Sequence, residues 1–393
     1  MIETWRWFGP SDSISLGKIA QAGATGIVSS LHEIKTGDVW PVDAIAERKK
    51  LIEDAGLEWT VIESIPVHND IKTRTGRYRQ YIENYKQSIV NAAACGVYTI
   101  CYNFMPVVDW TRTNLMYQLP NKSHALRFEM TDFAAYDIFM LNRDGARQSY
   151  ADAVIKKAES RFANMSEQEK VLLEKNIIAG LPGGEGSYTR DSIRSTIEQF
   201  IALGTEGFRQ NLFLFLQEII PVAEQAGALM CIHPDDPPFS LFGLPRVVST
   251  ADDARALLQA APSKANGLTL CAGSYGARCD NNLVEMAREF GPQIHFVHLR
   301  NVIREEDGSF YESDHLDGDN DMVGLVEALL SEEKRRMQST DNLPLIPMRP
   351  DHGHLLEDEL DLPDVKPGYS YIGRLKGLAE LRGVIHTVTR FIK

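Results

Sequence analysis

The chain has 393 residues, and 41 Lys and Arg stand against 54 Asp and Glu, so the formal net charge is −13. Apolar residues make up 44% of the sequence, enough for a chain of this length to bury a large core. The acidic total argues against a nucleic-acid partner, because a phosphate backbone requires a positive surface. We also expect no membrane partner, since no apolar run reaches about 18 residues and the first residues do not resemble a secretory signal.

The cysteines point to a reducing compartment. There are five of them, an odd number, and their spacing is irregular. This usage favours free thiols over a disulfide framework. We therefore expect a cytoplasmic protein in which one or two thiols are available for chemistry.

One local pattern recurs four times in the sequence. A helical stretch ends in a small residue followed by glycine, and an apolar β-type run comes next. The glycines are Gly23, Gly56, Gly96 and Gly227. Glycine suits the left-handed position that commonly follows a helix. Helix, glycine and strand in this order are typical of a parallel α/β fold.

Short apolar runs predict eight strands, separated by helical segments, with one further helix from residue 374 to about 392. Eight such alternations predict an α/β protein with the (β/α)8 TIM-barrel fold, formed as a single domain by residues 1–393. A doubly wound sheet is the alternative, because periodicity does not show closure. The predicted strands lie near residues 4–8, 26–31, 58–64, 97–104, 228–233, 267–272, 293–299 and 344–349.

The stretch between the fourth predicted strand and the helix that begins near Phe208 is too long for a bare loop. It contains a capping-box sequence at residues 166–169 and apolar residues at helical spacing from Tyr188 to Gly204. We predict a helical insertion over residues 107–205, after strand four and on the active-site face. It is either a lid or subunit contact, or an elaboration of the fold.

Metal-ligating side chains follow the last four predicted strands, at the ends where a parallel barrel carries its site. They are His233, Cys271, His298 and Asp351. Two imidazoles, a thiolate and a carboxylate suit a divalent transition metal better than Mg²⁺ or Ca²⁺. Zn²⁺ and Fe²⁺ fit the thiolate well, and Mn²⁺ fits it less obviously. The formal charges of such a site cancel, so it could accept an anionic substrate oxygen.

Strand alternation sorts the neighbouring side chains. If His298 points into the barrel, Arg300 does too and reaches the mouth, where it is the best candidate to clamp a substrate carboxylate. His295 then faces the helices. Cys231 shares the face of His233 one layer deeper and is expected to be a core residue.

Three residues after the last predicted strand are candidates for proton transfer or substrate contact. His352 adjoins Asp351, and His354 follows two positions later. Tyr369 lies in a loop with Pro and Gly, from which it could reach a substrate oxygen. The alternatives are packing for Tyr369 and a supporting or helix-capping role for His354.

Several sequence blocks match a known family in order and over essentially the whole length. The sequence resembles the D-mannonate dehydratases. The blocks are ETWRWFGP at residues 3–10, YNFMP at 102–106, DWTRT at 109–113, HPDDPP at 233–238, RPDHGH at 349–354 and GRLKG at 373–377.

The resemblance implies a TIM barrel related to the xylose-isomerase-like sugar enzymes. It also implies a hydro-lyase that converts D-mannonate to 2-dehydro-3-deoxy-D-gluconate in hexuronate catabolism, with Mn²⁺ or Fe²⁺ as cofactor. The family's metal ligands carry over onto the same four residues, and its proposed catalytic groups onto His352 and Tyr369. We further expect Arg300, Asn103, Trp7 and His354 to contact the substrate, and the chain to form a homodimer or higher homo-oligomer.

The expected reaction removes the C2 proton and expels the C3 hydroxyl. His352 is the expected base and Tyr369 the expected acid, although these roles could be exchanged. Two rival functions share the ligand set: a zinc hydrolase or sugar isomerase on the same barrel, and a non-catalytic sugar-acid sensor. The sensor would require an effector domain, and no such sequence is evident.

Overall fold

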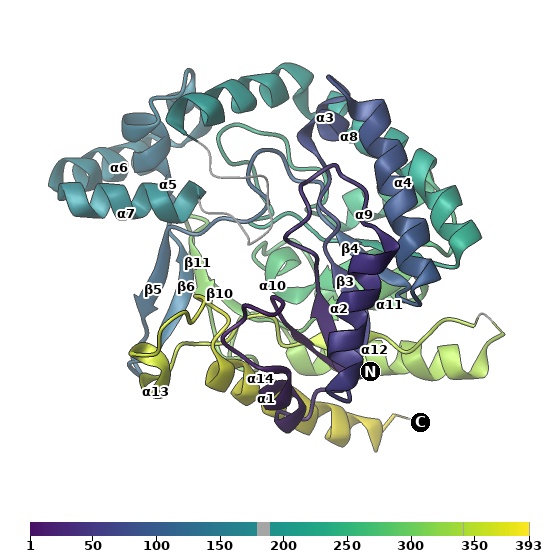
Figure 1. Cartoon of the computed structure of the whole chain (residues 1–393). Helices are drawn as coiled ribbons and strands as arrows, with labels where there is room; N and C mark the ends of the chain where they lie inside the picture. Colours follow the sequence, from purple (N-terminus) through teal and green to yellow (C-terminus); the bar gives the residue numbers. More distant parts are fainter. Residues whose placement is uncertain (179–188, 341, 393) are drawn as a thin grey trace.

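The computed structural model describes residues 1–178, 189–340 and 342–392. Eight parallel strands close into a barrel in the order β1-β12-β9-β8-β7-β4-β3-β2 (Figure 1). Each coincides with a predicted run, so the barrel prediction is confirmed and the doubly wound alternative is wrong. The strands are β1 (Ile2–Arg6), β2 (Gly26–Ser29), β3 (Glu58–Glu63), β4 (Thr99–Tyr102), β7 (Leu229–Ile232), β8 (Asn266–Cys271), β9 (Ile294–His298) and β12 (Pro347–Arg349).

Helices surround the barrel because each buries one face against it. In α2, Ile45, Arg48 and Ile52 are buried at spacings of three and four residues, which is one side of a helix. The helices are α1 (Leu16–Gln21), α2 (Val42–Asp54), α3 (Asn69–Thr73), α4 (Tyr78–Ala94), α8 (Arg190–Ala226), α9 (Ala251–Ala260), α10 (Ala272–Tyr275), α11 (Leu283–Phe290), η3 (Gly291–Gln293), α12 (Met322–Gln338), α13 (Glu357–Leu360) and α14 (Tyr371–Thr389).

The four predicted capping glycines all have positive φ, between 71° and 85°. In α8, the helix before Gly227 is continuous with the one predicted over residues 188–204. The two are joined across a kink at Gly204 (φ 63°, ψ 175°). Tyr188, where the first of them was predicted to begin, lies outside the described residues.

The barrel interior is a small apolar layer beneath the strand ends. It consists of Val28, Val61, Cys101, Cys231 and Phe296. The prediction that Cys231 is a core residue is confirmed, and Cys101 joins it there. His295 points the other way, as strand alternation requires, and its Nε2 lies 2.9 Å from the carbonyl oxygen of Lys264.

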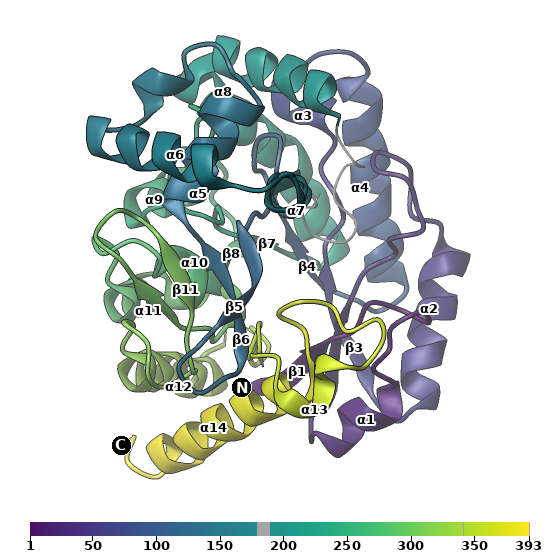
Figure 2. The ribbon, with the colours of Figure 1, turned by 90° about the vertical axis from the view of Figure 1, so that its left-hand side faces the viewer.

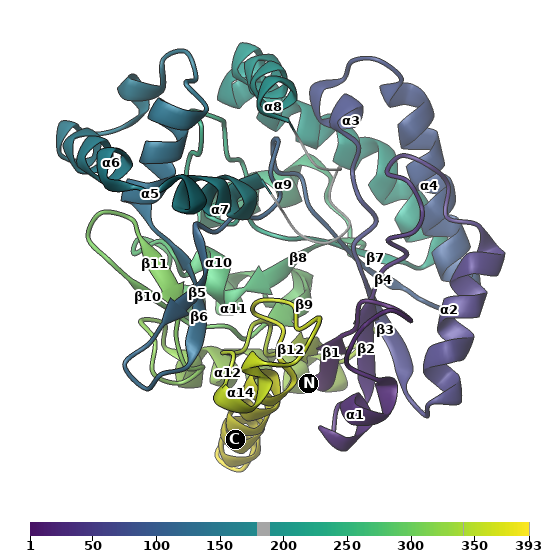
Figure 3. The same cartoon turned by 60° about the vertical axis from the view of Figure 1, so that its left-hand side comes forward.

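The segment predicted as a helical insertion contains two strands as well as helices. The two strands, β5 and β6, pair with each other, and β6 also pairs with β11, which pairs with β10, so the antiparallel sheet has the order β10-β11-β6-β5. Helices α5, α6 and α7 lie together beyond this sheet, apart from α2 and α14 (Figure 2; Figure 3). The elements are β5 (Asn114–Gln118), β6 (His124–Phe128), α5 (Met130–Ala135), η1 (Tyr136–Met140), η2 (Ala146–Ser149), α6 (Asp152–Asn164), α7 (Glu167–Ile178), β10 (Val302–Arg304) and β11 (Phe310–Glu312).

The predicted capping box is present at the start of α7. The Glu169 backbone N–H donates to Ser166 Oγ at 3.2 Å, and the Ser166 N–H donates to Glu169 Oε2 at 2.9 Å. In the part of the chain that the structure describes, every helix is too short or too polar to cross a membrane.

Candidate active site

Three metal-ligating side chains converge at the ends of neighbouring strands. His233 follows β7 directly, whereas Cys271 and His298 are the last residues of β8 and β9 and are paired in register. One ligand atom from each lies within 4.8 Å of the others. His233 Nε2 is 3.3 Å from His298 Nδ1. The prediction that these three side chains lie close together at the strand ends is therefore confirmed.

The surroundings of the two imidazoles favour one proton position on each ring. His233 Nδ1 lies 2.7 Å from the carbonyl oxygen of Pro234, which can only accept, so Nδ1 is the donor. His298 Nε2 lies 3.4 Å from Glu63 Oε1. The lone pairs of His233 Nε2 and His298 Nδ1 then face each other. Two acceptors cannot satisfy one another, but a shared cation satisfies both, so the donor set fits a metal ion.

Asp351, the fourth predicted ligand, lies beside this cluster. It follows β12 by two residues and has a left-handed backbone conformation with φ 65°. Its Oδ2 is 3.7 Å from His298 Nδ1 and 3.9 Å from Cys271 Sγ. Arg349 donates to Oδ1. Burial favours the neutral acid, but the positive charges around Asp351, that of Arg349 first among them, together outweigh it and hold the pKa of Asp351 well below its usual range.

His352 and Tyr369 lie next to each other at the edge of the cluster. Their rings meet edge to face with centroids 5.1 Å apart. His352 Nε2 is 3.8 Å from Asp351 Oδ1. Burial, together with the negative charge of Asp351, raises the pKa of Tyr369 to about 12. The Tyr369 hydroxyl therefore keeps its proton at neutral pH.

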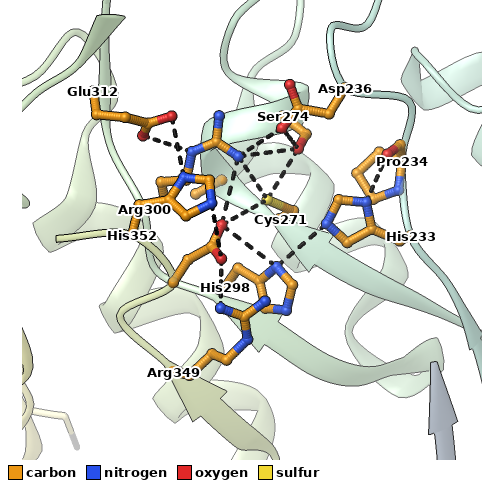
Figure 4. Close-up of polar contacts among 12 residues, drawn as sticks. His233, Pro234, Asp236, Cys271, Ser274, His298, Arg300, Glu312, Arg349 and His352 are labelled. Atoms are coloured by element: carbon orange, nitrogen blue, oxygen red, sulfur yellow. Dashed lines mark hydrogen bonds and ion pairs between the residues drawn. The ribbon is translucent and has the colours of Figure 1, made fainter. Parts of the chain in front are cut away.

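Arg300 reaches the barrel mouth, as strand alternation predicted, but its guanidinium is already engaged. Nε donates to Glu312 Oε2 and Nη1 donates to Asp236 Oδ2, each at 2.7 Å (Figure 4). Nη1 also lies 3.8 Å from Cys271 Sγ. Among the described residues Nη2 has no hydrogen-bond partner, although it is buried. Arg300 thus holds two carboxylates in place and keeps one nitrogen unpaired.

The structure places Trp7 outside the cavity lining, unlike its two neighbours. Strand alternation turns Arg6 and Phe8 toward the cavity, and both line it. Trp7 lies outside that lining and packs in the core, with the guanidinium of Arg48 on α2 over its ring at 5.6 Å. Trp7 is thus a packing residue in this structure, and its contact with a substrate stays a prediction. Asn103, also expected at the substrate, does line the cavity.

His354, also expected to contact the substrate, lies outside the cavity lining as well. His354 is buried outside the cavity lining, and its Nε2 lies 3.0 Å from the Glu312 carbonyl oxygen. Its Nδ1 lies 3.4 Å from Asp314 Oδ1. Both ring nitrogens are occupied by the neighbouring loop, which is the supporting role that was the alternative interpretation.

Several functional candidates were missed in the sequence. Glu63 ends β3, so the strand-end rule could have found it. Trp110 and Arg112 lie in the DWTRT block. This block was assigned to the predicted helical insertion, so neither residue was considered for the site. Asp236 lies three residues after His233, and Glu312 belongs to a three-residue strand that gave no signal.

The cavity above the cluster is lined by charged and aromatic side chains. Three arginines face four carboxylates, with aromatic rings between them. The lining comprises Arg6, Phe8, His32, Glu63, Ser64, Asn103, Met105, Asp109, Trp110, His233, Asp236, Arg300, Arg349, Asp351, His352 and Tyr369.

The model of a protein family described as D-mannonate dehydratase (UxuA) matches residues 1–393. The chain belongs to the D-mannonate dehydratase family. It is therefore a dehydratase, that is, a hydro-lyase. The resemblance seen in the sequence blocks is confirmed.

Relatives of known name agree with the D-mannonate dehydratase assignment. The mannonate dehydratase of Saccharophagus degradans is 74% identical over 388 residues, which are 99% of this chain and 98% of the relative. Mannonate dehydratase 2 of Agrobacterium fabrum is 56% identical over 393 residues, or 100% of this chain and 98% of the relative.

Solved structures support both the family and the fold. The crystal structure of mannonate dehydratase from Streptococcus suis serotype 2 has a TM-score of 0.79 at 32% identity, covering 100% of this chain and 95% of that one. A xylose isomerase domain protein from Planctomyces limnophilus has a TM-score of 0.50 at 10% identity, covering 100% and 98%. The second likeness concerns the barrel fold alone.

Proposed function

We propose that the chain converts D-mannonate to 2-dehydro-3-deoxy-D-gluconate and water at a metal site formed by His233, Cys271, His298 and Asp351. The observation that carries this proposal is the convergence of two imidazole lone pairs and a thiol within 4.8 Å. Mn²⁺ or Fe²⁺ is the proposed ion, and Zn²⁺ also suits the donor set. When bound, the ion supplies a Lewis acid for the substrate's carboxylate or C2 hydroxyl oxygen.

His352 is the proposed base. The C2 proton is weakly acidic because its removal places charge next to a carboxylate, so the base must be positioned closely. His352 lines the cavity and is enclosed by Trp110 and Tyr369, whose rings meet its own edge to face. These contacts fix the plane of the imidazole. Asp351 is a poorer base, because its carboxylate is held by Arg349.

Tyr369 is the proposed acid. Its hydroxyl is protonated at neutral pH, since its pKa is raised to about 12. The C2–H electrons form the C2=C3 bond, and the C3 hydroxyl leaves as water with the tyrosine proton. The resulting enol becomes the 2-keto acid when a solvent proton adds to C3 and the C2 hydroxyl gives its own proton to the tyrosinate of Tyr369. His352 releases the proton it took from C2 to solvent, so one water is lost and both side chains return to their starting states.

Capture of an anionic substrate by a chain of charge −13 requires local attraction. Arg6, Arg300 and Arg349 all line the cavity. The Arg6 Nη1 bonds the backbone oxygen of Glu63, and its Nη2 lies 3.1 Å from His32 Nε2. Arg6 therefore makes no ion pair through these contacts, which leaves its positive charge to act on the substrate.

The test is incubation of the anaerobically metal-loaded protein with D-mannonate in D₂O, followed by NMR of the product. The proposal predicts a 2-keto-3-deoxy acid that carries one solvent deuterium at C3. A ketose product would support the sugar isomerase instead. Tight binding with unchanged D-mannonate would support the sensor.

We also place this reaction in the hexuronate catabolism of the cytoplasm, where Cys271 stays reduced and able to bind metal. Deletion of the gene should prevent growth on glucuronate. The wild-type gene should restore growth, and a gene encoding His352→Asn should not. Growth of the deletion strain at the normal rate on glucuronate would overturn this placement.

A further inference from the structure

Four buried charged side chains form a closed ring beside the cavity. Arg112 Nη1 donates to Asp236 Oδ1 at 2.7 Å, and Arg300 Nη1 donates to Asp236 Oδ2 at 2.7 Å. Arg300 Nε donates to Glu312 Oε2 at 2.7 Å, and Arg112 Nη2 closes the ring with Glu312 Oε1 at 3.2 Å. The side chains are at most 4% exposed. Two positive and two negative charges cancel, which makes their burial tolerable.

The ring ties together parts of the chain that are far apart in sequence. Arg112 comes from the segment after β4, Asp236 from the loop after β7, and Arg300 from the loop after β9. Glu312 is the last residue of β11, in the antiparallel sheet outside the barrel. Figure 4 shows Glu312 and Asp236 on opposite sides of the Arg300 guanidinium. The position of Glu312 is therefore set by two arginines that are themselves fixed.

Glu312 also has a contact outside the ring. Its Oε1 lies 3.2 Å from the buried Nδ1 of His352. The contact is not a well-aligned hydrogen bond, which is common at catalytic histidines. We infer that Glu312 is a positioning residue for the reaction. It accepts a hydrogen bond from the protonated Nδ1 of His352, and so leaves Nε2 as the nitrogen that takes the substrate proton. This inference rests on the proposed function, because it assumes that His352 is the base.

The chemistry of the carboxylate gives the reason. An ionised carboxylate can only accept, so it selects the His352 tautomer that is protonated on Nδ1. Its negative charge also stabilises the imidazolium that forms when Nε2 takes a proton. Burial raises the pKa of Glu312, but the positive charges around it, that of Arg300 first among them, together lower it to about 2, so the carboxylate is ionised at neutral pH.

The two carboxylate oxygens of Glu312 have different partners, which allows the positioning of His352 to be tested apart from structural support. Oε2 accepts from Arg300, which holds the side chain in place. Oε1 faces His352 and accepts a hydrogen bond from Arg112, which also donates to Asp236. Asp236 binds both arginines of the ring but makes no recorded contact with His352 in the described residues. The two carboxylates thus offer a matched pair of substitutions.

The test compares Glu312→Gln with Asp236→Asn, each of which removes one negative charge from the ring. For Glu312→Gln we expect kcat to fall about 10- to 100-fold with KM changed much less, and the primary isotope effect on C2-deuterated substrate to rise. Glu312→Asp, which keeps the charge, should recover part of the loss. The ¹⁵N NMR spectrum of the Zn²⁺-loaded protein, with the His352 signals assigned through His352→Asn, reports the tautomer directly.

We expect the His352 proton to reside on Nδ1 in the wild type and in Asp236→Asn, and to leave Nδ1 in Glu312→Gln. An Nε2 proton in the wild type, or an unchanged tautomer and kcat in Glu312→Gln, would overturn the inference. A different result would overturn the proposed function. C2-proton exchange at the wild-type rate in His352→Asn would show that His352 is not the base, independently of the results for Glu312→Gln.

Discussion

Glu63 Oε1 lies 3.4 Å from His298 Nε2, on the edge of the imidazole opposite the nitrogen that faces His233. Arg349 holds this carboxylate through two donors, Nη2 to Oε1 at 2.8 Å and Nε to Oε2 at 3.1 Å. The same guanidinium bonds Asp351. Arg349 therefore links Glu63, which orients the proposed ligand His298, with Asp351, which is itself a proposed ligand. The donor atoms are held in position by the protein's own contacts.

Replacing Glu63 with Gln should weaken metal binding. The carboxylate that faces His298 Nε2 at 3.4 Å is lost, so the imidazole becomes less basic and less firmly oriented, and we expect metal affinity to fall about 10- to 100-fold. Competition with a chromogenic chelator measures this. Glu53→Gln, at an exposed ion pair on α2, is the control. Equal affinities for the wild type and Glu63→Gln would contradict the orienting role.

The two proposed proton-transfer residues should separate the two halves of the reaction. His352→Asn, with metal retained, should abolish exchange of the C2 proton with solvent, because the base is gone. Tyr369→Phe should keep that exchange and lose dehydration, because the acid is gone. Proton NMR in D₂O follows both processes in one sample. If Tyr369→Phe loses exchange and His352→Asn keeps it, the roles are reversed.

Removal of Arg349 should destabilise the fold. Arg349→Met leaves Glu63 and Asp351 buried without their cation, and breaking a buried pair in this way costs about 3–5 kcal/mol. Urea unfolding with a chelator present measures it, so that lost metal binding does not contribute. Lys50→Met breaks the exposed pair with Asp54 and should cost at most about 0.5 kcal/mol. Equal losses in the two variants would contradict this account of Arg349.

Buried His295 should make the protein sensitive to acid. Burial lowers the pKa of His295 to about 3, whereas the unfolded chain binds this proton near the ordinary value of about 6.5. Between these values the unfolded state holds the extra proton, so stability is full above pH ~6.5 and falls by about 1.4 kcal/mol per unit as pH drops. His295→Gln should flatten this part of the stability-against-pH curve. His386→Gln, on the exposed face of α14, is the control, and an unchanged slope in His295→Gln would refute the assignment.

The sequence predicted the barrel and the three-residue cluster because both follow from strong, local regularities. Strand and helix periods gave the eight repeats, and strand ends gave His233, Cys271 and His298. The same alternation rule, applied to the first strand, would have separated Arg6 and Phe8 from Trp7. Trp7 was instead assigned to the substrate through its sequence block, and the structure places it in the core.

Glu312 and the antiparallel sheet could not be predicted in the same way. Strands β10 and β11 have three residues each, too few to show a period, and β5 carries partly exposed residues throughout. Their pairing joins segments far apart in the chain, from Asn114 to Glu312. The charge ring depends on this pairing, so its members are recognisable only once the fold is known.

The central claim is that dehydration depends on a metal ion held at the strand-end cluster. The most direct measurement is activity on D-mannonate during anaerobic titration of the chelator-treated protein with Mn²⁺ or Fe²⁺, in the wild type, in Cys271→Ser and in the exposed-cysteine control Cys279→Ser. We predict no activity without metal and a rise that saturates at one ion per chain. We further predict weaker binding with lower activity in Cys271→Ser, and wild-type behaviour in Cys279→Ser. Full activity of the metal-free wild type would contradict the account.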